Sequence, residues 1–284
     1  MSATDILDAC TAGRLPPPIA LMHLIGAADS ADDFAALLAR ARAAQTPGLD
    51  ALCALAARNP ACWRLTQDML ATVAHDAAPT IAQLATMFDD AVALSPAASV
   101  ALYSMGDETA LDEATQDIVA LMRAAGLLSP DHALLDLGCG IGRCVRALAP
   151  LMRQVTGLDI SPRMIAEARR RCTEFANVRL AVSSGEDLGA IADASVDIVL
   201  AADVFPYLVQ VDLALAATHV REAARVLRPG GALLILNFSY RGDAARDAQD
   251  LSAMLAAADL RPAALPAFVL THWDATPFLG RRPD

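Results

Sequence analysis

Lysine is absent from this chain of 284 residues, so all 22 of its basic side chains are arginines. The phosphate loop of nucleotide-binding proteins ends in Gly-Lys-Ser or Gly-Lys-Thr, which excludes that motif here. The 33 aspartates and glutamates give a formal net charge of −11 at pH 7. Because nucleic-acid affinity comes largely from basic residues that neutralise phosphates, we expect no nucleic-acid partner. Arginine without lysine, together with abundant alanine, indicates a GC-rich and therefore bacterial genome.

Signals for metal sites, export and membranes are also missing. The six cysteines form no Cys-x-x-Cys pair and have no histidine at ligand spacing, so we expect reduced thiols and no metal. Residues 1–8 carry acids and lack the basic-then-apolar pattern of a signal peptide. No apolar run approaches the length of a membrane span. The sequence predicts a cytoplasmic protein with no membrane partner.

One stretch, residues 134–143, joins a short apolar run to an acid and three alternating glycines. Helical spacing of apolar residues follows it, which predicts a buried parallel strand, a tight turn and a helix. Glycine suits such a turn because the missing Cβ permits unusual φ angles and lets a ligand approach the backbone. The dinucleotide fingerprint needs glycine at its sixth position, where Arg143 or Val145 stands. A nicotinamide-dependent oxidoreductase is therefore disfavoured.

A second acid, Asp159, ends the next short apolar run. Ser161 and Pro162 follow it and start a helix. Asp159 lies one strand–helix–strand step after Asp136, where an acid can accept hydrogen bonds from both hydroxyls of a ribose. The alternative is that Asp159 caps the helix that starts at Pro162, and the agreement of two motifs favours the ribose role.

The run Asp-x-Gly-x-Gly-x-Gly at 136–142 resembles the first motif of class I S-adenosylmethionine (SAM)-dependent methyltransferases. The strand that ends in Asp159, the apolar strand at 196–203 and the Pro-Gly-Gly turn at 229–231 match the same family in the same order. Together these motifs cover about residues 100–240.

The resemblance implies an α/β fold with a seven-stranded, mostly parallel sheet and helices on both faces. The family strand order is 3-2-1-4-5-7-6, with strand 7 antiparallel. The resemblance also implies SAM as cofactor and in-line transfer of its methyl group to a small-molecule acceptor. Two other classes stay open. One is a non-catalytic regulatory subunit that binds SAM or S-adenosylhomocysteine (SAH), and the other is an enzyme that uses SAM for aminopropyl transfer or cyclisation.

Residues at the ends of the strands are the candidates for cofactor binding. Relatives often carry an acid near the start of the loop after strand 3, where it meets the adenine amino group, and Ser184 stands there instead. The adenine contact is expected from Ser184, Glu186 or the Gly185 amide. Tyr103 fits a segment that closes over the cofactor, or else anchors the connecting helix. The predicted cofactor-binding residues are Tyr103, Asp136, Gly138, Gly140, Gly142, Asp159, Ile160, Ser184, Gly185, Glu186 and Ala202.

The end of the fourth predicted strand supplies the catalytic candidates, Asp203 and Tyr207. Asp203 could act as a base or orient the acceptor, and the alternative is a structural acid that caps the next helix. No catalytic triad is expected, because the SAM sulfonium is already activated and the protein need only align the acceptor and exclude water. The predicted acceptor-binding residues are Phe205, Tyr207, Asn237 and Tyr240.

Residues 1–95 are predicted to be a helical domain, and residues 96–284 the methyltransferase domain. Apolar residues recur at helical spacing in the first part, for example over 63–74 and 80–94. His23 and His75 stand alone there and are expected to be packing or surface residues. We expect this region to pack over the carboxyl ends of the strands as a lid, or to support a homodimer. Two strands, over 262–269 and 270–279, are expected to complete the sheet.

Overall fold

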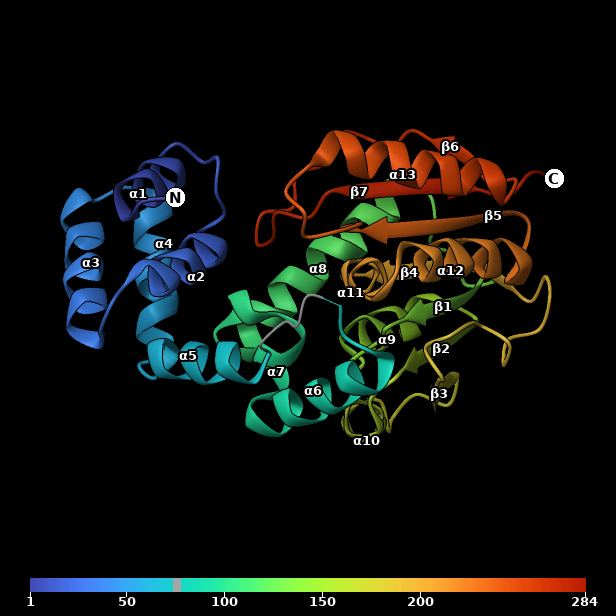
Figure 1. Cartoon of the computed structure of the whole chain (residues 1–284), viewed down its shortest axis with the longest axis horizontal. Helices are drawn as coiled ribbons and strands as arrows, with labels where there is room; N and C mark the ends of the chain where they lie inside the picture. The colour runs from blue at the N-terminus through green and yellow to red at the C-terminus, as the bar shows by residue number, and fades with distance from the viewer. Residues whose placement is uncertain (74–77) are drawn as a thin grey trace. The chain divides into compact units, whose positions relative to one another are not determined.

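The computed structural model of the chain describes residues 1–73 and 78–284. The chain forms two compact units whose segments alternate along the sequence. Unit 1 comprises Met1–Ala74, Asp90–Asp117 and Val269–Asp274, and unit 2 comprises His75–Asp89, Ile118–Phe268 and Ala275–Asp284. The predicted end of a helix at Ala74, and the prediction for His75, lie outside the described residues. Figure 1 shows the elements of both units.

Unit 1 is helical, as the sequence predicted for its first part. Its elements are α1 (Ala3–Thr11), α2 (Pro17–Ala27), α3 (Ala31–Ala44), α4 (Pro47–Arg58), α5 (Cys62–Thr72), α7 (Pro96–Val100) and the 3-10 helix η1 (Leu102–Ser104), with the end of α6 (Ile81–Leu94) and the start of α8 (Glu108–Ala124). Proline begins α2, α4 and α7, where its missing N–H needs no partner. Ser30 and Ser95 cap α3 and α7 through their side chains. Leu24 and Leu52 lie in the apolar core that these helices share.

Unit 2 contains a seven-stranded sheet in the order β3-β2-β1-β4-β5-β7-β6. The strands are β1 (Ala133–Leu137), β2 (Gln154–Asp159), β3 (Val178–Val182), β4 (Val196–Ala202), β5 (Leu227–Leu236), β6 (Arg261–Ala263) and β7 (Pro277–Arg281). Pairing is parallel from β3 to β5, whereas β7 is antiparallel to both β5 and β6. The predicted strand order and the antiparallel strand 7 are confirmed.

The helices of unit 2 connect these strands. They are α9 (Arg143–Leu148), followed by η2 (Ala149–Leu151), α10 (Pro162–Arg171), α11 (Phe205–Val211), α12 (Leu213–Val226) and α13 (Ala244–Ala257). β1 is fully buried, which explains its continuous apolar run. Val199 of β4, Ile235 of β5, Val220 of α12 and Leu251 of α13 share one core. No helix in the described part of the chain has both the length and the apolar character needed to cross a bilayer.

The Pro-Gly-Gly turn differs slightly from the prediction. The sequence indicated a helix that ends at this turn and a strand that follows it. In the structure the turn lies inside β5, because Leu227 already pairs with Val196 before the register shifts and Ala232 pairs with Ile198. Gly231 has no room for a side chain, since a Cβ there would lie 2.9 Å from the Asp197 carbonyl oxygen.

The predictions for the last two strands were wrong in their bounds. β6 and β7 are short, and the residues between them are irregular. Pro262, Pro266 and Pro277 cannot donate to a strand ladder, which limits regular pairing in this stretch. The apolar residues that suggested a strand have other surroundings, since Val269 is 77% exposed and Trp273 is buried.

Residues Val269–Asp274 of this stretch belong to unit 1, where two contacts hold them. The Trp273 ring stacks on Tyr103, with ring centroids 6.1 Å apart. The Asp117 carboxylate of α8 accepts hydrogen bonds from the backbone N–H groups of Thr271 and His272, at 2.7 and 2.9 Å. Tertiary contacts of this kind outweigh the local strand pattern.

Candidate functional site

The glycine turn after β1 adopts the left-handed conformations that glycine takes most readily. The φ angle is 68° at Gly138, 52° at Gly140 and 77° at Gly142. Gly138 also lacks room for a side chain, because a Cβ there would lie 2.7 Å from the Val204 side chain. The turn directly follows Leu137, the last residue of β1, and so lies at the carboxyl end of that strand. Open α/β sheets bind their ligands at this end.

Asp159, the last residue of β2, ties this turn to the neighbouring strand. Its Oδ2 accepts a hydrogen bond from the Gly140 backbone N–H at 2.8 Å, and its Oδ1 accepts one from the Ser161 N–H at 2.9 Å. Burial raises the pKa of Asp159, while the amides of Ser161 and Gly140 oppose that shift. A carboxylate offers about four lone-pair sites, so Asp159 keeps capacity for further donors.

The N-terminal cap of α10, which was the alternative role for Asp159, is provided by Ser161. The Ser161 hydroxyl accepts the hydrogen bond from the Met164 N–H at 3.0 Å, and Ser161 is the N-cap residue of α10. The Asp159 carboxylate instead lies between the glycine turn and the start of the helix. Its ribose-binding role stays a prediction.

Asp136, in β1, is the second buried acid of this region and is only 2% exposed. Burial raises its pKa to about 7, although the nearby Arg143 guanidinium lowers it and Asp159 raises it further. Its Oδ2 is buried and has no hydrogen-bond partner among residues 1–73 and 78–284. A buried carboxylate oxygen without a donor is costly, so Asp136 is a candidate to meet a donor or a positive charge on a bound ligand.

The first part of α6, up to Asp89, belongs to unit 2 and packs on the same strand ends. The Asp89 carboxylate accepts hydrogen bonds from the Ser161 hydroxyl at 2.5 Å and from the Arg163 N–H at 3.0 Å. Ile81 lies against Gly185, where a Cβ would approach the Ile81 side chain to 2.8 Å. The sequence did not predict these contacts, because no spacing links residues so far apart in the chain.

Asp203 and Asn237 follow β4 and β5 directly, and both adopt a left-handed conformation with φ of 64°. The Asn237 Nδ2 donates a hydrogen bond to the Asp203 Oδ1 at 3.2 Å. The Asp203 N–H donates to the Leu236 carbonyl oxygen at 2.9 Å, and the Asn237 N–H donates to the Thr276 carbonyl oxygen at 3.0 Å. The two polar side chains therefore meet at the carboxyl end of neighbouring strands.

Two tyrosines complete this polar group. The rings of Tyr207 and Tyr240 meet edge to face with centroids 6.0 Å apart, and Phe88 of α6 meets Tyr207 in the same way at 5.0 Å. The Tyr240 hydroxyl is hydrogen-bonded to Asp203 and to the Tyr207 hydroxyl. Desolvation and the negative charge of Asp203 raise the pKa of Tyr207. Tyr240 is 56% exposed, and the negative charge of the nearby Asp203 raises its pKa. Both tyrosines stay protonated at neutral pH.

Unit 2 brings most of the predicted site residues to the carboxyl ends of its strands. These are Asp136, Gly138, Gly140, Gly142, Asp159, Ile160, Ser184, Gly185, Glu186, Ala202, Asp203, Tyr207, Asn237 and Tyr240. In the loop after β3, the Ser184 hydroxyl accepts from the Glu186 N–H at 3.2 Å. Phe205 is fully buried in the core and stacks on Phe238. Tyr103 belongs to unit 1.

Comparisons with known proteins identify the class of this unit. Residues 135–235 match the family described as "Methyltransferase domain". Demethylmenaquinone methyltransferase from Tropheryma whipplei (strain Twist) is 38% identical over 107 residues, which are 38% of this chain and 42% of that protein. Ubiquinone biosynthesis O-methyltransferase from Xanthomonas campestris pv. campestris (strain B100) is 35% identical over 113 residues, 39% of this chain and 45% of that protein. The chain spans less than half the length of these curated relatives.

Solved structures share the fold at low sequence identity. The [4+2]-cyclase SpnF has a TM-score of 0.54 and 19% identity, covering 73% of this chain and 98% of that one. Phosphoethanolamine N-methyltransferase 1 from Haemonchus contortus, solved with phosphoethanolamine and SAH, has a TM-score of 0.54 and 17% identity, covering 72% and 49%. The chain therefore contains a class I methyltransferase domain, and the predicted family resemblance is confirmed.

Proposed function

We propose that the protein is a SAM-dependent methyltransferase that methylates a small molecule. The observation that carries this proposal is the 2.8 Å bond between the Gly140 N–H and the Asp159 Oδ2, which joins the glycine turn of β1 to the acid that ends β2. This arrangement suits a ligand with a ribose and an extended charged tail. The matched methyltransferase domain supports the same conclusion, because it spans both motifs.

Three features of unit 2 fit SAM. Asp159 is placed to accept hydrogen bonds from the ribose hydroxyls, and Gly138 provides a turn without a side chain. The buried Oδ2 of Asp136, which has no partner in the described part of the chain, suits the positive charges of SAM. We assign the remaining cofactor contacts to Ile160, Ser184, Gly185, Glu186 and Ala202. Bound SAM supplies an activated methyl group on its sulfonium, which needs no further activation by the protein.

The acceptor is assigned to the polar and aromatic group at the ends of β4 and β5. Tyr207, Tyr240 and Asn237 would contact it, and Asp203 would orient it or accept its proton. Phe205 contributes to the apolar core and is not part of the proposed acceptor contacts. Holding the acceptor in line with the methyl group and keeping water out are the main tasks of such a site.

Ligand-dependent melting tests this proposal. SAM and SAH should each raise the melting temperature of the full chain, because a ligand that binds only the folded state stabilises it by mass action. Asp159→Ala should shift the half-maximal ligand concentration to higher values. No shift at ligand concentrations far above the micromolar range would contradict the proposal.

The melting experiment does not test the role of residues 1–95. We propose that they act as a lid or as the contact surface of a homodimer. Light scattering gives the oligomeric state of the full chain. A dimer whose variants dissociate without loss of methyl transfer would support the dimerisation role. A monomeric full chain would contradict the dimerisation role and favour the lid role.

A further inference from the structure

We propose that the acceptor carries a flat aromatic ring, and that Phe88 of α6 is the residue that selects it. This inference rests on the methyl-transfer function proposed above and adds the chemical class of the acceptor. Phe88 packs against Tyr207, although the two residues are far apart in the sequence. The proposal thus gives a ligand contact to a helix that precedes all the methyltransferase motifs.

Three aromatic side chains from three elements meet at the carboxyl ends of β4 and β5. Tyr207 of α11 meets Phe88 at an interplanar angle of 76° with ring centroids 5.0 Å apart. It meets Tyr240, in the loop after β5, at 90° with centroids 6.0 Å apart. Aromatic residues make up only 4% of the chain, yet two of its three tyrosines lie in this aromatic group. A chain so poor in aromatic residues therefore concentrates them where open α/β sheets bind ligands.

Packing of the core does not account for the aromatic group. The nearby pair Phe205 and Phe238 is at most 1% exposed and belongs to the core of unit 2. Phe88 and Tyr207 are partly exposed, and Tyr240 is 56% exposed. Apolar ring surface in contact with water is unfavourable, and a cluster of such surface marks a place where a ligand binds. The exposed ring surface is therefore available to a ligand that covers it.

The orientation of the rings suits another flat ring. In an edge-to-face contact, the edge of one ring meets one face of the other. Phe88 and Tyr240 each make one such contact with Tyr207, so each keeps at least one face that Tyr207 does not cover. An aromatic ligand can stack on such a face or meet it edge-on, and both contacts are favourable beyond the burial of area. A puckered, saturated ring of the same size lacks this contribution.

Phe88 is held in place by anchored residues before and after it on α6. The Thr80 hydroxyl accepts a hydrogen bond from the Gln83 N–H at 3.2 Å, and the Gln83 Oε1 accepts one from the Thr80 N–H at 2.8 Å, which caps the start of the helix. Asp89, directly after Phe88, accepts the hydrogen bond from the Ser161 hydroxyl. A side chain on a helix held in this way can keep a ligand ring in a fixed position.

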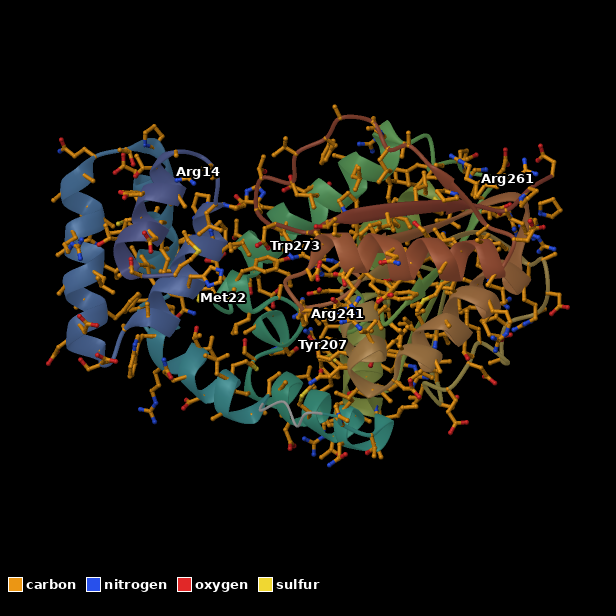
Figure 2. The ribbon with its side chains drawn as sticks, turned by 45° about the horizontal axis from the view of Figure 1, so that its top comes forward. Arg14, Met22, Tyr207, Arg241, Arg261 and Trp273 are labelled. Carbon is orange, nitrogen blue, oxygen red and sulfur yellow. The ribbon has the colours of Figure 1, made fainter. Side chains whose placement is uncertain are left out.

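The loop that carries Tyr240 is also held on both sides of that residue. The Ser239 hydroxyl donates a hydrogen bond to the Asp247 carboxylate at 2.7 Å, and the Arg241 guanidinium donates to the same carboxylate at 2.5 Å. Figure 2 shows Arg241 on this loop and Tyr207 on α11. Tyr240 is thus exposed but lies between two anchored neighbours, which suits a residue that meets a ligand at the surface.

Phe88 differs from the other two members of the aromatic group because its side chain has no polar atom. Its contribution to acceptor binding is therefore confined to ring contacts and apolar burial. A substitution at Phe88 removes the ring without removing a side-chain hydrogen bond. This makes Phe88 the position at which recognition of a ring is measured most cleanly.

The test measures probe binding to the full chain saturated with SAH, which fills the cofactor site so that no probe can take the place of adenine. The probes are 2-naphthol and decahydro-2-naphthol, which share a carbon skeleton and a hydroxyl group but differ in flatness and aromaticity. Ligand-observed NMR gives the Kd of each. The variants are Phe88→Leu and Phe88→Tyr. Phe175→Leu is the matched control, because Phe175 is also partly exposed but precedes β3, at the amino end of that strand.

The wild type should bind 2-naphthol at least about tenfold more tightly than decahydro-2-naphthol. Phe88→Leu should reduce this ratio to about threefold or less, with the Kd for SAH changed by less than about twofold. Phe88→Tyr keeps the ring and should keep the ratio, as should Phe175→Leu. Tyr240→Leu changes an exposed position and should lower the ratio as well, which provides a second test if Phe88→Leu does not fold.

Equal affinity of the wild type for the two probes, or binding of neither probe to the SAH-loaded chain, would overturn the inference. The same holds if Phe88→Leu keeps the wild-type ratio, or if Phe175→Leu lowers it as much as Phe88→Leu does. Failure of SAM and SAH to bind is measured separately, before any probe is added. That result would contradict the proposed function itself.

Discussion

Asn237 donates a hydrogen bond from its side-chain amide to the Asp203 carboxylate, and both residues adopt φ of 64° directly after neighbouring parallel strands. Ala202 and Leu236, the residues before them, are paired in the sheet. The register of the sheet therefore sets these two side chains against each other. Such a pair combines a structural task at the strand ends with a place at the proposed acceptor site.

Substitutions at Asn237 separate its two structural contributions. Asn237→Ala removes the bond to Asp203 and the acceptor for the Thr276 N–H, and it leaves alanine in a left-handed conformation. Asn237→Gly removes the same bonds but suits the backbone. We expect urea unfolding to show alanine about 1 kcal/mol less stable than glycine at this position. Equal stability of the two variants would mean that the backbone is not strained.

Asp159 should control cofactor affinity. Asp159→Ala removes the predicted bonds to the ribose and the bond to the Gly140 N–H, so calorimetry should show the Kd for SAH raised about tenfold or more. The control is Ser161→Ala, which removes the cap of α10 and should cost about 1 kcal/mol of stability with a much smaller change in Kd. A variant at Asp159 that unfolds yet keeps its residual affinity would assign the residue a purely structural role.

Asp136 predicts a pH dependence of stability with a definite sign. Burial raises its pKa in the folded chain from 3.8 to about 7. Between these values the folded state binds more protons than the unfolded state, so the free energy of unfolding falls as pH rises from about 4 to about 7. Asp136→Asn should flatten this slope in part, since the pKa of Asp159 is raised by burial as well.

The affinity for SAM should rise as Asp136 ionises, whereas the free energy of unfolding falls. The ionised Asp136 favours a cationic ligand, so SAM should bind more tightly at pH 8 than at pH 6. Calorimetry on Asp136→Asn should show little change in SAM affinity over that range. A pH-independent affinity in the wild type would place Asp136 away from the charges of SAM.

The contacts of α6 predict an effect on binding from a residue far along the chain. Asp89→Ala removes the acceptor for the Ser161 hydroxyl and the Arg163 N–H, next to Asp159. We expect the Kd for SAH to rise a few-fold, because the end of β2 is less firmly held. Thr86→Ala on the same helix is the control, since the Thr86 hydroxyl donates to the Ala82 carbonyl oxygen within the helix. Equal effects of the two variants would contradict a specific role for Asp89.

The glycine turn and the acid that ends β2 were predictable from sequence because their chemistry is local. A turn with three left-handed positions requires glycine, and its position between a buried strand and a helix is written in adjacent residues. The strand order came from the family resemblance, which these motifs were specific enough to support. Asp136 and Asp159 were found in the same way.

Contacts between distant segments were not predictable in this way. Asp89 and Ser161 are separated by 72 positions, and no spacing rule connects them. Residues Val269–Asp274 have an apolar pattern that suggested a strand, but the stacking of Trp273 on Tyr103 decides their place in unit 1. Phe205 was predicted to contact the acceptor because it is an aromatic residue just after β4. In the structure it is buried in the core and stacks on Phe238. Packing decides such cases, and the pattern of a single segment does not contain that information.

Identification of the nucleoside product tests the central claim most directly. The full chain is incubated with methyl-labelled SAM and a library of small-molecule acceptors, and the nucleoside and the labelled product are quantified together. The account predicts SAH and methylated acceptor in equal amounts, and loss of both in Asp159→Ala at limiting SAM. Methylthioadenosine as the product, or SAM bound without any turnover, would contradict it.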